Sequence, residues 1–256
     1  MRFSITGHDP LATGRGYSKH LYTINESHPR RHRGPMAPKQ SADRTQRYAP
    51  DGSHLKLNAI QWEDLTRRPI EDLANLTLAL PLPGNRLQFR FLGEDILVDI
   101  RNHRLMRVRE NIDVPLDDPL LELVTLVYLN QVNTVLPLDR DIVGLQDLKE
   151  SHFFIGPHEL RTASVLERYG DDPEGFHRAV AALDGRMVDM ADAAGRLLPF
   201  PRIPLYFLMW FADEEFPARL RILFDRSIEH FLPADAIWAL INRVARALVD
   251  GTALST

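Results

Sequence analysis

The sequence predicts an α+β protein, in which antiparallel strands pack against several helices and a basic segment precedes the folded part. Two observations predict the strands: an apolar–polar alternation broken by short turns over about residues 86–109, and a strand–turn–strand pattern over 203–225. A third observation predicts the helices, which begin at prolines and end at glycines. Because helices and strands do not alternate regularly along the chain, a parallel sheet is not expected.

The N-terminal half of the folded part is expected to be a helical segment followed by a meander. Residues 60–75 carry apolar side chains at helical spacing, and Pro69 interrupts them at a position that suits a helix start. Residues 87–91 then alternate apolar and polar side chains, which indicates a half-buried strand. Turns near residues 93–95 and 102–103 predict three antiparallel strands in this region.

A buried central helix is expected next. Asp118 and Pro119 have the residue types of a helix cap and first helical position. The residues up to about Asn133 are apolar almost all round, which is typical of a helix buried on every side. Three further helices are predicted to start at Pro157, Pro173 and Pro233 and to end near Gly170, Gly185 and Gly251.

The densest apolar run, residues 203–212, predicts a core strand whose hairpin partner is 218–225. In that hairpin, two residues that face each other across the strands are expected to have residue numbers that add up to about 429. Arg202 and Asp225 are then neighbours at the open end. The carboxylates of the 213–217 turn lie about 27 Å away at the other end.

Charge is unevenly distributed along the chain. The net charge is -4, but the first 55 residues hold nine basic and four acidic side chains and carry +5, which leaves -9 on the rest. Residues 1–54 also lack a sustained apolar period, so we expect a disordered basic arm there and a single α+β domain over 55–251. The residues from Met36 onward look like a natural protein start, so residues 1–35 are a candidate start-site extension.

Composition excludes several classes of protein. The chain has no cysteine, which rules out disulfides, a cysteine nucleophile and an iron–sulfur cluster held by cysteines. It contains no apolar run of about 18 residues and no apolar stretch at its start, so a cytoplasmic protein without a membrane segment is expected. The P-loop, GxGxxG, HExxH and GxSxG signatures are all absent from the sequence.

The segment 199–233 resembles a bacterial and archaeal family, the domain of unknown function number 3786. The residues that carry the resemblance are PRIPL at 201–205, Trp210, DEEFP at 213–217, ILFD at 222–225 and the LP pair at 232–233. The resemblance extends over most of residues 60–249. It implies no activity, but family members occur largely in anaerobes, and some are joined to a cysteine-rich iron–sulfur module. This chain lacks that module and is linked to cofactor or redox metabolism by association only.

Two groups of residues are candidate site residues. Asp213, Glu214 and Glu215 at the turn have the oxygen ligands that Mg²⁺ or Ca²⁺ prefers, although the pattern favours a polar tight turn. At the other end, Arg202 between two prolines is a candidate clamp for an anionic ligand. Asp225 and His230 would complete that site, or Arg202 and Asp225 would form a structural ion pair.

Three functions remain open. A non-catalytic accessory domain that binds a small molecule or a protein partner is the first, because no catalytic signature is present. A metal-dependent enzyme that uses the carboxylates and the histidine of the 202–230 region is the second. Nucleic-acid binding through the basic arm is the third and weakest, since the acidic body repels phosphate. The sequence indicates neither a particular cofactor nor an oligomeric state.

Overall fold

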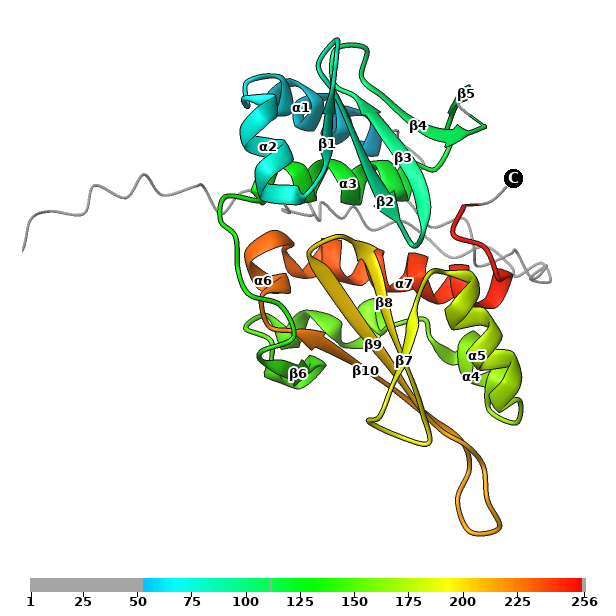
Figure 1. Cartoon of the computed structure of the whole chain (residues 1–256). Coiled ribbons are helices and arrows are strands. Elements are labelled where there is room, and N and C mark those ends of the chain that lie inside the picture. The colour runs from blue at the N-terminus through cyan, green and yellow to red at the C-terminus, as the bar shows by residue number, and fades with distance from the viewer. Residues whose placement is uncertain (1–52, 111, 255–256) are drawn as a thin grey trace, which may run out of the picture. The chain divides into compact units, whose positions relative to one another are not determined.

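The computed structural model describes residues 53–110 and 112–254, with side chains from residue 59 onward. Residues 1–52 of the predicted basic arm, and with them the start-site extension, lie outside these ranges. Within residues 48–256 the described chain forms one compact unit of two antiparallel five-stranded sheets and seven α-helices (Figure 1). The predicted α+β fold is therefore confirmed.

The first sheet has the strand order β1-β2-β3-β4-β5, so every neighbour in space is a neighbour along the chain. Its strands are β1 (Leu80–Leu82), β2 (Arg86–Phe91), β3 (Glu94–Asp99), β4 (Arg104–Arg109) and β5 (Ile112–Pro115). The predicted meander is confirmed as β2–β4, and an additional short strand lies at each edge. Helices α1 (Ser53–Thr66), α2 (Ile70–Thr77) and α3 (Pro119–Gln131) accompany this sheet.

The second sheet has the order β6-β10-β9-β8-β7. Its strands are β6 (Ile142–Gly144), β7 (Arg186–Val188), β8 (Ala193–Phe200), β9 (Ile203–Trp210) and β10 (Arg219–Asp225). Four helices accompany it: α4 (Ala163–Tyr169), α5 (Pro173–Ala182), α6 (Ile228–Phe231) and α7 (Ala234–Asp250). No helix in the described part of the chain is long and apolar enough to cross a membrane.

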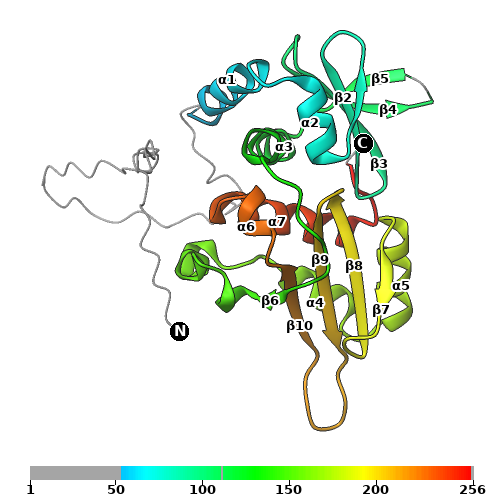
Figure 2. The ribbon, with the colours of Figure 1, turned by 60° about the vertical axis from the view of Figure 1, so that its left-hand side comes forward.

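Helices α3 and α7 form the centre of the unit, where they lie against each other between the two sheets (Figure 2). Asp118 caps α3 as predicted, because its Oδ1 accepts a hydrogen bond of 3.0 Å from the Leu121 amide. Seven residues of α3 and twelve of α7 are buried. Such extensive burial provides most of the stability of a helix in water.

Phe200, at the end of β8, joins the second sheet to the first. Its ring lies 5.7 Å from that of Phe89 and 5.6 Å from that of Phe91, both on β2, and 4.8 Å from the ring of Tyr128 on α3. All four aromatic side chains are buried. The two sheets thus share one aromatic core, which fixes the position of β8 relative to β2.

Two sequence predictions need correction. The helix expected from Pro157 is a short 3-10 turn at Gly156–His158, and the α-helix begins only at Ala163. Strand β8 was not predicted, because seven of its eight residues are buried and its sequence AAGRLLPF does not alternate between apolar and polar. A strand that is covered on both faces lacks the period of two that reveals a half-buried one.

Candidate functional site

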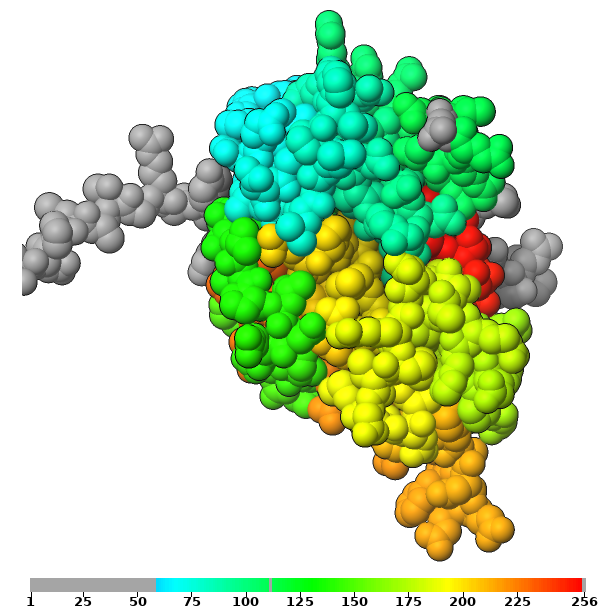
Figure 3. All heavy atoms as spheres, viewed as in Figure 1, coloured from blue at the N-terminus to red at the C-terminus, as the bar shows by residue number. Residues whose placement is uncertain are grey.

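The β9–β10 hairpin has the predicted register, in which Trp210 pairs with Arg219 and Leu205 pairs with Phe224. Its turn projects from the rest of the unit (Figure 3). The two candidate groups of residues therefore lie at opposite ends of the hairpin, as the sequence predicted, and each is considered separately.

Of the three turn carboxylates, Asp213 closes the turn through hydrogen bonds. Oδ1 of Asp213 accepts hydrogen bonds from the amides of Glu215 and Phe216, at 2.8 and 2.6 Å. These bonds, the one from Phe216 first, hold the pKa of the Asp213 carboxyl below its usual value. Asp213, Glu214 and Glu215 are all exposed, and among the described residues no group of three or more acidic or histidine side chains is arranged to hold a metal ion.

Arg202 and Asp225 each have other partners. Arg202 is 8% exposed, and its Nε donates a hydrogen bond of 2.6 Å to the carbonyl of Leu76 at the end of α2. Asp225 is 2% exposed and accepts hydrogen bonds from the amides of Ser227 and Arg140, at 2.9 and 3.2 Å. No ion pair between Arg202 and Asp225 is formed in residues 53–254.

His230, the third member of this predicted group, is exposed on the short helix α6. Its side chain has no hydrogen bond to Arg202 or Asp225 in the described part of the chain. The structure therefore gives Arg202 and Asp225 structural roles in joining segments, and it does not bring the three residues together as a ligand site. Their role in binding stays a prediction.

We expect Asp225→Ala to destabilise the protein more than Asp213→Ala. Loss of the Asp225 carboxylate leaves the amide of buried Ser227 without an acceptor, at a cost of about 2 kcal/mol. Loss of the exposed Asp213 carboxylate leaves two amides that water can reach. Thermal denaturation of the two variants measures the difference, and equal melting temperatures would contradict it.

A polar cluster joins buried Arg196 on β8 and Tyr206 on β9 to the exposed Asp139, which lies before β6. Arg196 donates from Nε and Nη2 to the two carboxylate oxygens of Asp139, at 3.1 and 2.9 Å, and the Tyr206 hydroxyl donates to Oδ1. Burial and the bond to Asp139 raise the pKa of Tyr206 to about 12. Burial also acts to raise the pKa of Asp139, but the bonds from Arg196 and Tyr206 outweigh it and lower that pKa. The cluster connects the segment between α3 and β6 to the second sheet. Its three side chains form hydrogen bonds with one another.

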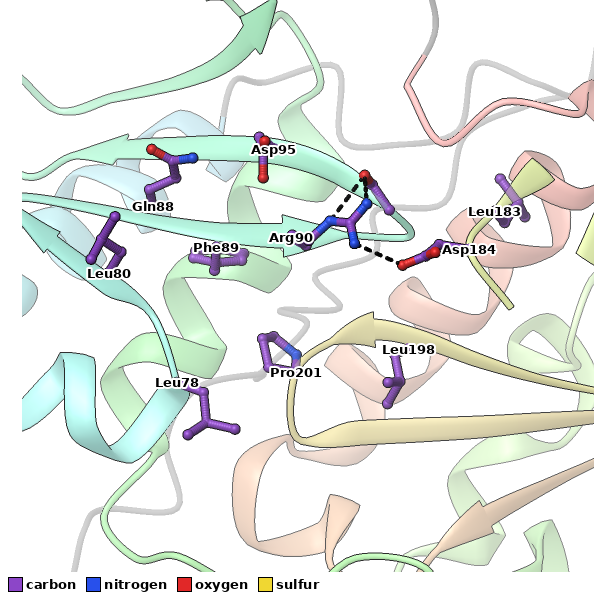
Figure 4. Close-up of a pocket in the computed structure, with 11 residues that line it drawn as sticks. Leu78, Leu80, Gln88, Phe89, Arg90, Asp95, Leu183, Asp184, Leu198 and Pro201 are labelled. Carbon is purple, nitrogen blue, oxygen red and sulfur yellow. Dashed lines mark hydrogen bonds and ion pairs between the residues drawn. The ribbon is translucent and has the colours of Figure 1, made fainter. Parts of the chain in front are cut away.

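A cleft of about 440 Å³ lies between the first sheet and the β8 end of the second, and we call it the inter-sheet cleft. Its residues come from seven parts of the chain: the end of α2, the strands β1, β2 and β3, the turns after β2 and α5, and the end of β8. They are Leu78, Leu80, Gln88, Phe89, Arg90, Gly93, Asp95, Leu183, Asp184, Leu198 and Pro201 (Figure 4). The cleft thus depends on how the two sheets pack together.

Four apolar side chains of the inter-sheet cleft are accessible. Leu78 and Leu80 are 60% and 57% exposed, which is unusual for leucine, and Leu198 and Pro201 are partly exposed nearby. Leu78 is also held in the left-handed region, at φ 59°, where it ends α2. A leucine in this conformation costs about 1 kcal/mol, and the left-handed region is a common way for a helix to end.

An ion pair closes one end of the inter-sheet cleft. Nη1 of Arg90 lies 2.9 Å from Oδ2 of Asp184, while Nε and Nη2 of Arg90 donate to the Gly93 carbonyl at 3.1 and 2.6 Å (Figure 4). Gly93 has φ +87°, and a Cβ at this position would lie 2.6 Å from the Cβ of Asp184. Only glycine therefore allows the β2–β3 turn to approach the residue after α5 so closely.

The remaining polar groups of the inter-sheet cleft are Gln88 and Asp95, which lie on neighbouring strands β2 and β3 and are half-buried. In the register of β2 and β3, Asp95 lies opposite Arg90, and Gln88 lies two residues before Arg90 on the same face of the sheet. Neither side chain has a hydrogen bond or ion pair with another residue in the described part of the chain. These groups face a space that a ligand can enter.

Apart from Pro201, which belongs to the PRIPL string, no residue of the cleft stands out in the sequence. The alternation in β2 correctly predicts that Gln88 and Arg90 face away from the core, and that is the only signal they carry. Nothing in the sequence shows that Asp184 and Pro201 approach the same face, because they lie about a hundred residues further along the chain. The cleft residues could be found only once the packing of the sheets was known.

The geometry defines a class of α+β proteins with two antiparallel sheets and a cleft between them. The chain belongs to the family described as a domain of unknown function, DUF3786, whose model matches residues 71–247. The match includes every residue of the inter-sheet cleft and the β9–β10 hairpin, and it confirms the resemblance found in the sequence. No curated protein matches the chain. No solved structure matches it either.

Proposed function

We propose that this protein is a non-catalytic accessory domain that binds a small molecule with an apolar body in the inter-sheet cleft. The observation that carries the proposal is the pair of exposed leucines, Leu78 and Leu80, which face a cleft of about 440 Å³. Ligand pockets in proteins commonly have volumes of 300–1,000 Å³ and combine apolar walls with a few polar groups. The inter-sheet cleft has both features.

The side chains of the cleft favour binding over catalysis. Among the described residues that line it, there is no histidine, serine, threonine or lysine to act as a nucleophile or as a base near neutral pH. Its charged side chains are Arg90, Asp95 and Asp184, and two of these pair with each other. The wider association with anaerobic cofactor or redox metabolism is part of the proposal and depends on the family resemblance alone.

The proposal is tested by titrating the ¹⁵N-labelled full-length protein with 1-naphthalenemethanol, a neutral apolar probe. We expect chemical-shift changes at the amides of Leu80, Gly93 and Asp184, which surround the cleft. Leu80→Asn should weaken binding at least about fivefold, because it removes apolar contact area worth about 1 kcal/mol or more. Binding is measured as a Kd from the shift changes.

Ile112→Asn is the matched control for Leu80→Asn. Ile112 is 62% exposed on β5, the opposite edge strand of the same sheet, and does not line the inter-sheet cleft. Its replacement should leave the Kd unchanged. The proposal is wrong if the probe shifts amides spread over the whole surface, or if the Leu80 and Ile112 variants bind it equally well.

A further inference from the structure

We propose that the ligand of the inter-sheet cleft carries a cationic group, an amine or a guanidine, that pairs with Asp95. This inference rests on the proposed function, since it names the chemical class of molecule that the same cleft takes. Its basis is the arrangement of charge along the polar wall.

The only cationic side chain of the cleft is already engaged. Arg90 donates two hydrogen bonds to the Gly93 carbonyl and forms an ion pair of 2.9 Å with Asp184. The close approach of Gly93 to Asp184, which only glycine allows, holds these two partners next to each other. Arg90 would offer an anionic ligand only the N–H groups that Gly93 and Asp184 leave unused, and the neighbouring Asp184 carboxylate would repel the anion.

Asp95 lies opposite Arg90 in the strand pairing, but the Arg90 guanidinium bonds to Gly93 and Asp184 and forms no ion pair with Asp95. Its carboxylate lines the cleft and is half-buried, and no cationic side chain of the described residues lies within 4 Å of it. With Arg90 and Asp184 compensating each other, the lining carries one uncompensated negative charge. A partly desolvated carboxylate is stabilised by an opposite charge more strongly than an exposed one, because water screens the interaction less.

Gln88 adds a second acceptor beside Asp95. Its side-chain oxygen is free to accept a hydrogen bond in the described structure, and it lies on the same face of the first sheet, two residues from the position that pairs with Asp95. Figure 4 shows Gln88 and Asp95 on the strands along one side of the cleft, with Leu78, Leu198 and Pro201 on the other. An ammonium or guanidinium group that meets Asp95 and Gln88 would therefore place its apolar body against Leu78, Leu198 and Pro201.

The test compares three probes that share one apolar body and differ in charge: 1-naphthylmethylamine, 1-naphthalenemethanol and 1-naphthoate. Each is titrated into the ¹⁵N-labelled full-length protein at pH 7, where the amine is cationic and the naphthoate anionic. We expect the amine to bind at least tenfold more tightly than the naphthoate, with the neutral alcohol between them. Added salt should reduce this preference.

Asp95→Asn should bring the Kd values of amine and naphthoate to within about twofold of each other. Asp113→Asn is the matched control, because Asp113 is a carboxylate of β5 in the same sheet that does not line the cleft. This variant should keep the full preference. Thermal melts check that both variants fold, which is expected because Asp95 has no hydrogen bond or ion pair to lose and the Arg86–Asp113 contact of 3.7 Å is partly exposed.

The outcomes separate this inference from the proposed function. If the alcohol binds in the cleft but the amine binds no better than the naphthoate, the cationic ligand is wrong and the apolar site stands. An amine preference that survives Asp95→Asn would also overturn the inference, because another group would then supply the charge. If none of the probes shifts the cleft amides, both the proposed function and this inference are wrong.

Discussion

Phe200→Ala is expected to lower the free energy of unfolding by about 4 kcal/mol, the largest effect of any single substitution proposed for this protein. Phe200 is fully buried, and its ring contacts Phe89, Phe91 and Tyr128 at centroid distances of 4.8–5.7 Å. Alanine would leave a cavity at the point where β8 meets β2 and α3. Because each sheet supplies part of this cluster, neither sheet can close the cavity by itself.

Urea denaturation followed by circular dichroism measures this loss. Phe200→Leu fills most of the volume and should cost roughly 1 kcal/mol, so the pair separates the cavity from the loss of aromatic contacts. Phe216→Ala is the surface control, since Phe216 is 56% exposed at the tip of the hairpin and should change stability by less than about 0.5 kcal/mol. A Phe200→Ala variant within about 1 kcal/mol of the natural protein would contradict a shared core.

The same variant tests the prediction that residues 55–251 form a single domain. If the two sheets unfold together, hydrogen exchange should show β2–β4 and β8–β10 losing protection at the same urea concentration in the Phe200→Ala variant. Separate transitions for the two sheets would instead indicate two domains that are only in contact. Loss of protection at one urea concentration would support the single-domain prediction, and loss at two different concentrations would contradict it.

Helix starts show how far local sequence signals lead. Two helices begin at the proline of an Asp-Pro pair, as the sequence predicts. In each, the aspartate caps the helix: Asp118 accepts from the Leu121 amide at 3.0 Å and Asp172 from the Gly175 amide at 2.8 Å. Pro157 follows Gly156 instead, and no α-helix begins there. The proline fixes its own φ, but the aspartate satisfies a free amide of the first turn. The carboxylate is therefore the more informative half of the signal.

Pro233 comes before a helix whose first amides find carboxylates other than that of a preceding aspartate, since the Ala234 amide donates to Glu150 at 3.4 Å and the Ala236 amide to Asp235 at 2.8 Å. It precedes α7 and has no capping side chain, yet the helix runs for 17 residues to Gly251, whose φ of 67° ends it as predicted. Twelve buried residues stabilise α7 along its whole length. The apolar period of the sequence predicts this helix, but it does not reveal that Glu150, from a distant part of the chain, accepts from the first helical amide.

The sequence predicted the register of the β9–β10 hairpin because a hairpin relates neighbouring parts of the chain through one turn. It could not predict the inter-sheet cleft, whose walls are distant in sequence. Arg202 illustrates the difference: it lies just before β9, outside the β9–β10 pairing, and its hydrogen-bond partner, the carbonyl of Leu76, lies 126 residues earlier in the chain. Local patterns determine elements, whereas the partners of buried polar groups depend on tertiary packing.

Arg243→Ala is expected to lower the free energy of unfolding by about 3 kcal/mol. Arg243 is 6% exposed on α7, and its Nε donates to Oδ2 of Asp118 at 2.8 Å while its Nη2 donates to the Ala253 carbonyl at 2.5 Å. Its guanidinium also lies 5.8 Å from the centre of the Phe91 ring. Removal of one partner of a largely buried ion pair is costly because the other charge is left without compensation.

The position of Asp118 makes this ion pair more than a local contact. Its Oδ1 caps α3 through the Leu121 amide while its Oδ2 binds Arg243, so one carboxylate joins the start of α3 to the middle of α7. Arg243→Lys should recover less than half of the lost stability, because an ammonium group cannot present two parallel donors to Asp118 and Ala253. Arg246→Ala is the control: Arg246 is 72% exposed one turn further along α7, and its pair with Asp250 should contribute less than about 0.5 kcal/mol.

A double-mutant cycle with Arg243→Ala and Asp118→Ala, measured by urea denaturation, isolates the pair itself. We expect a coupling energy above about 1 kcal/mol, which an exposed ion pair would not reach. A coupling near zero would show that Arg243 acts through the Ala253 carbonyl and the Phe91 ring instead. In that case Arg243→Met, which preserves the packing against Phe91 but donates no hydrogen bond, separates the contribution of the ring contact from that of the carbonyl.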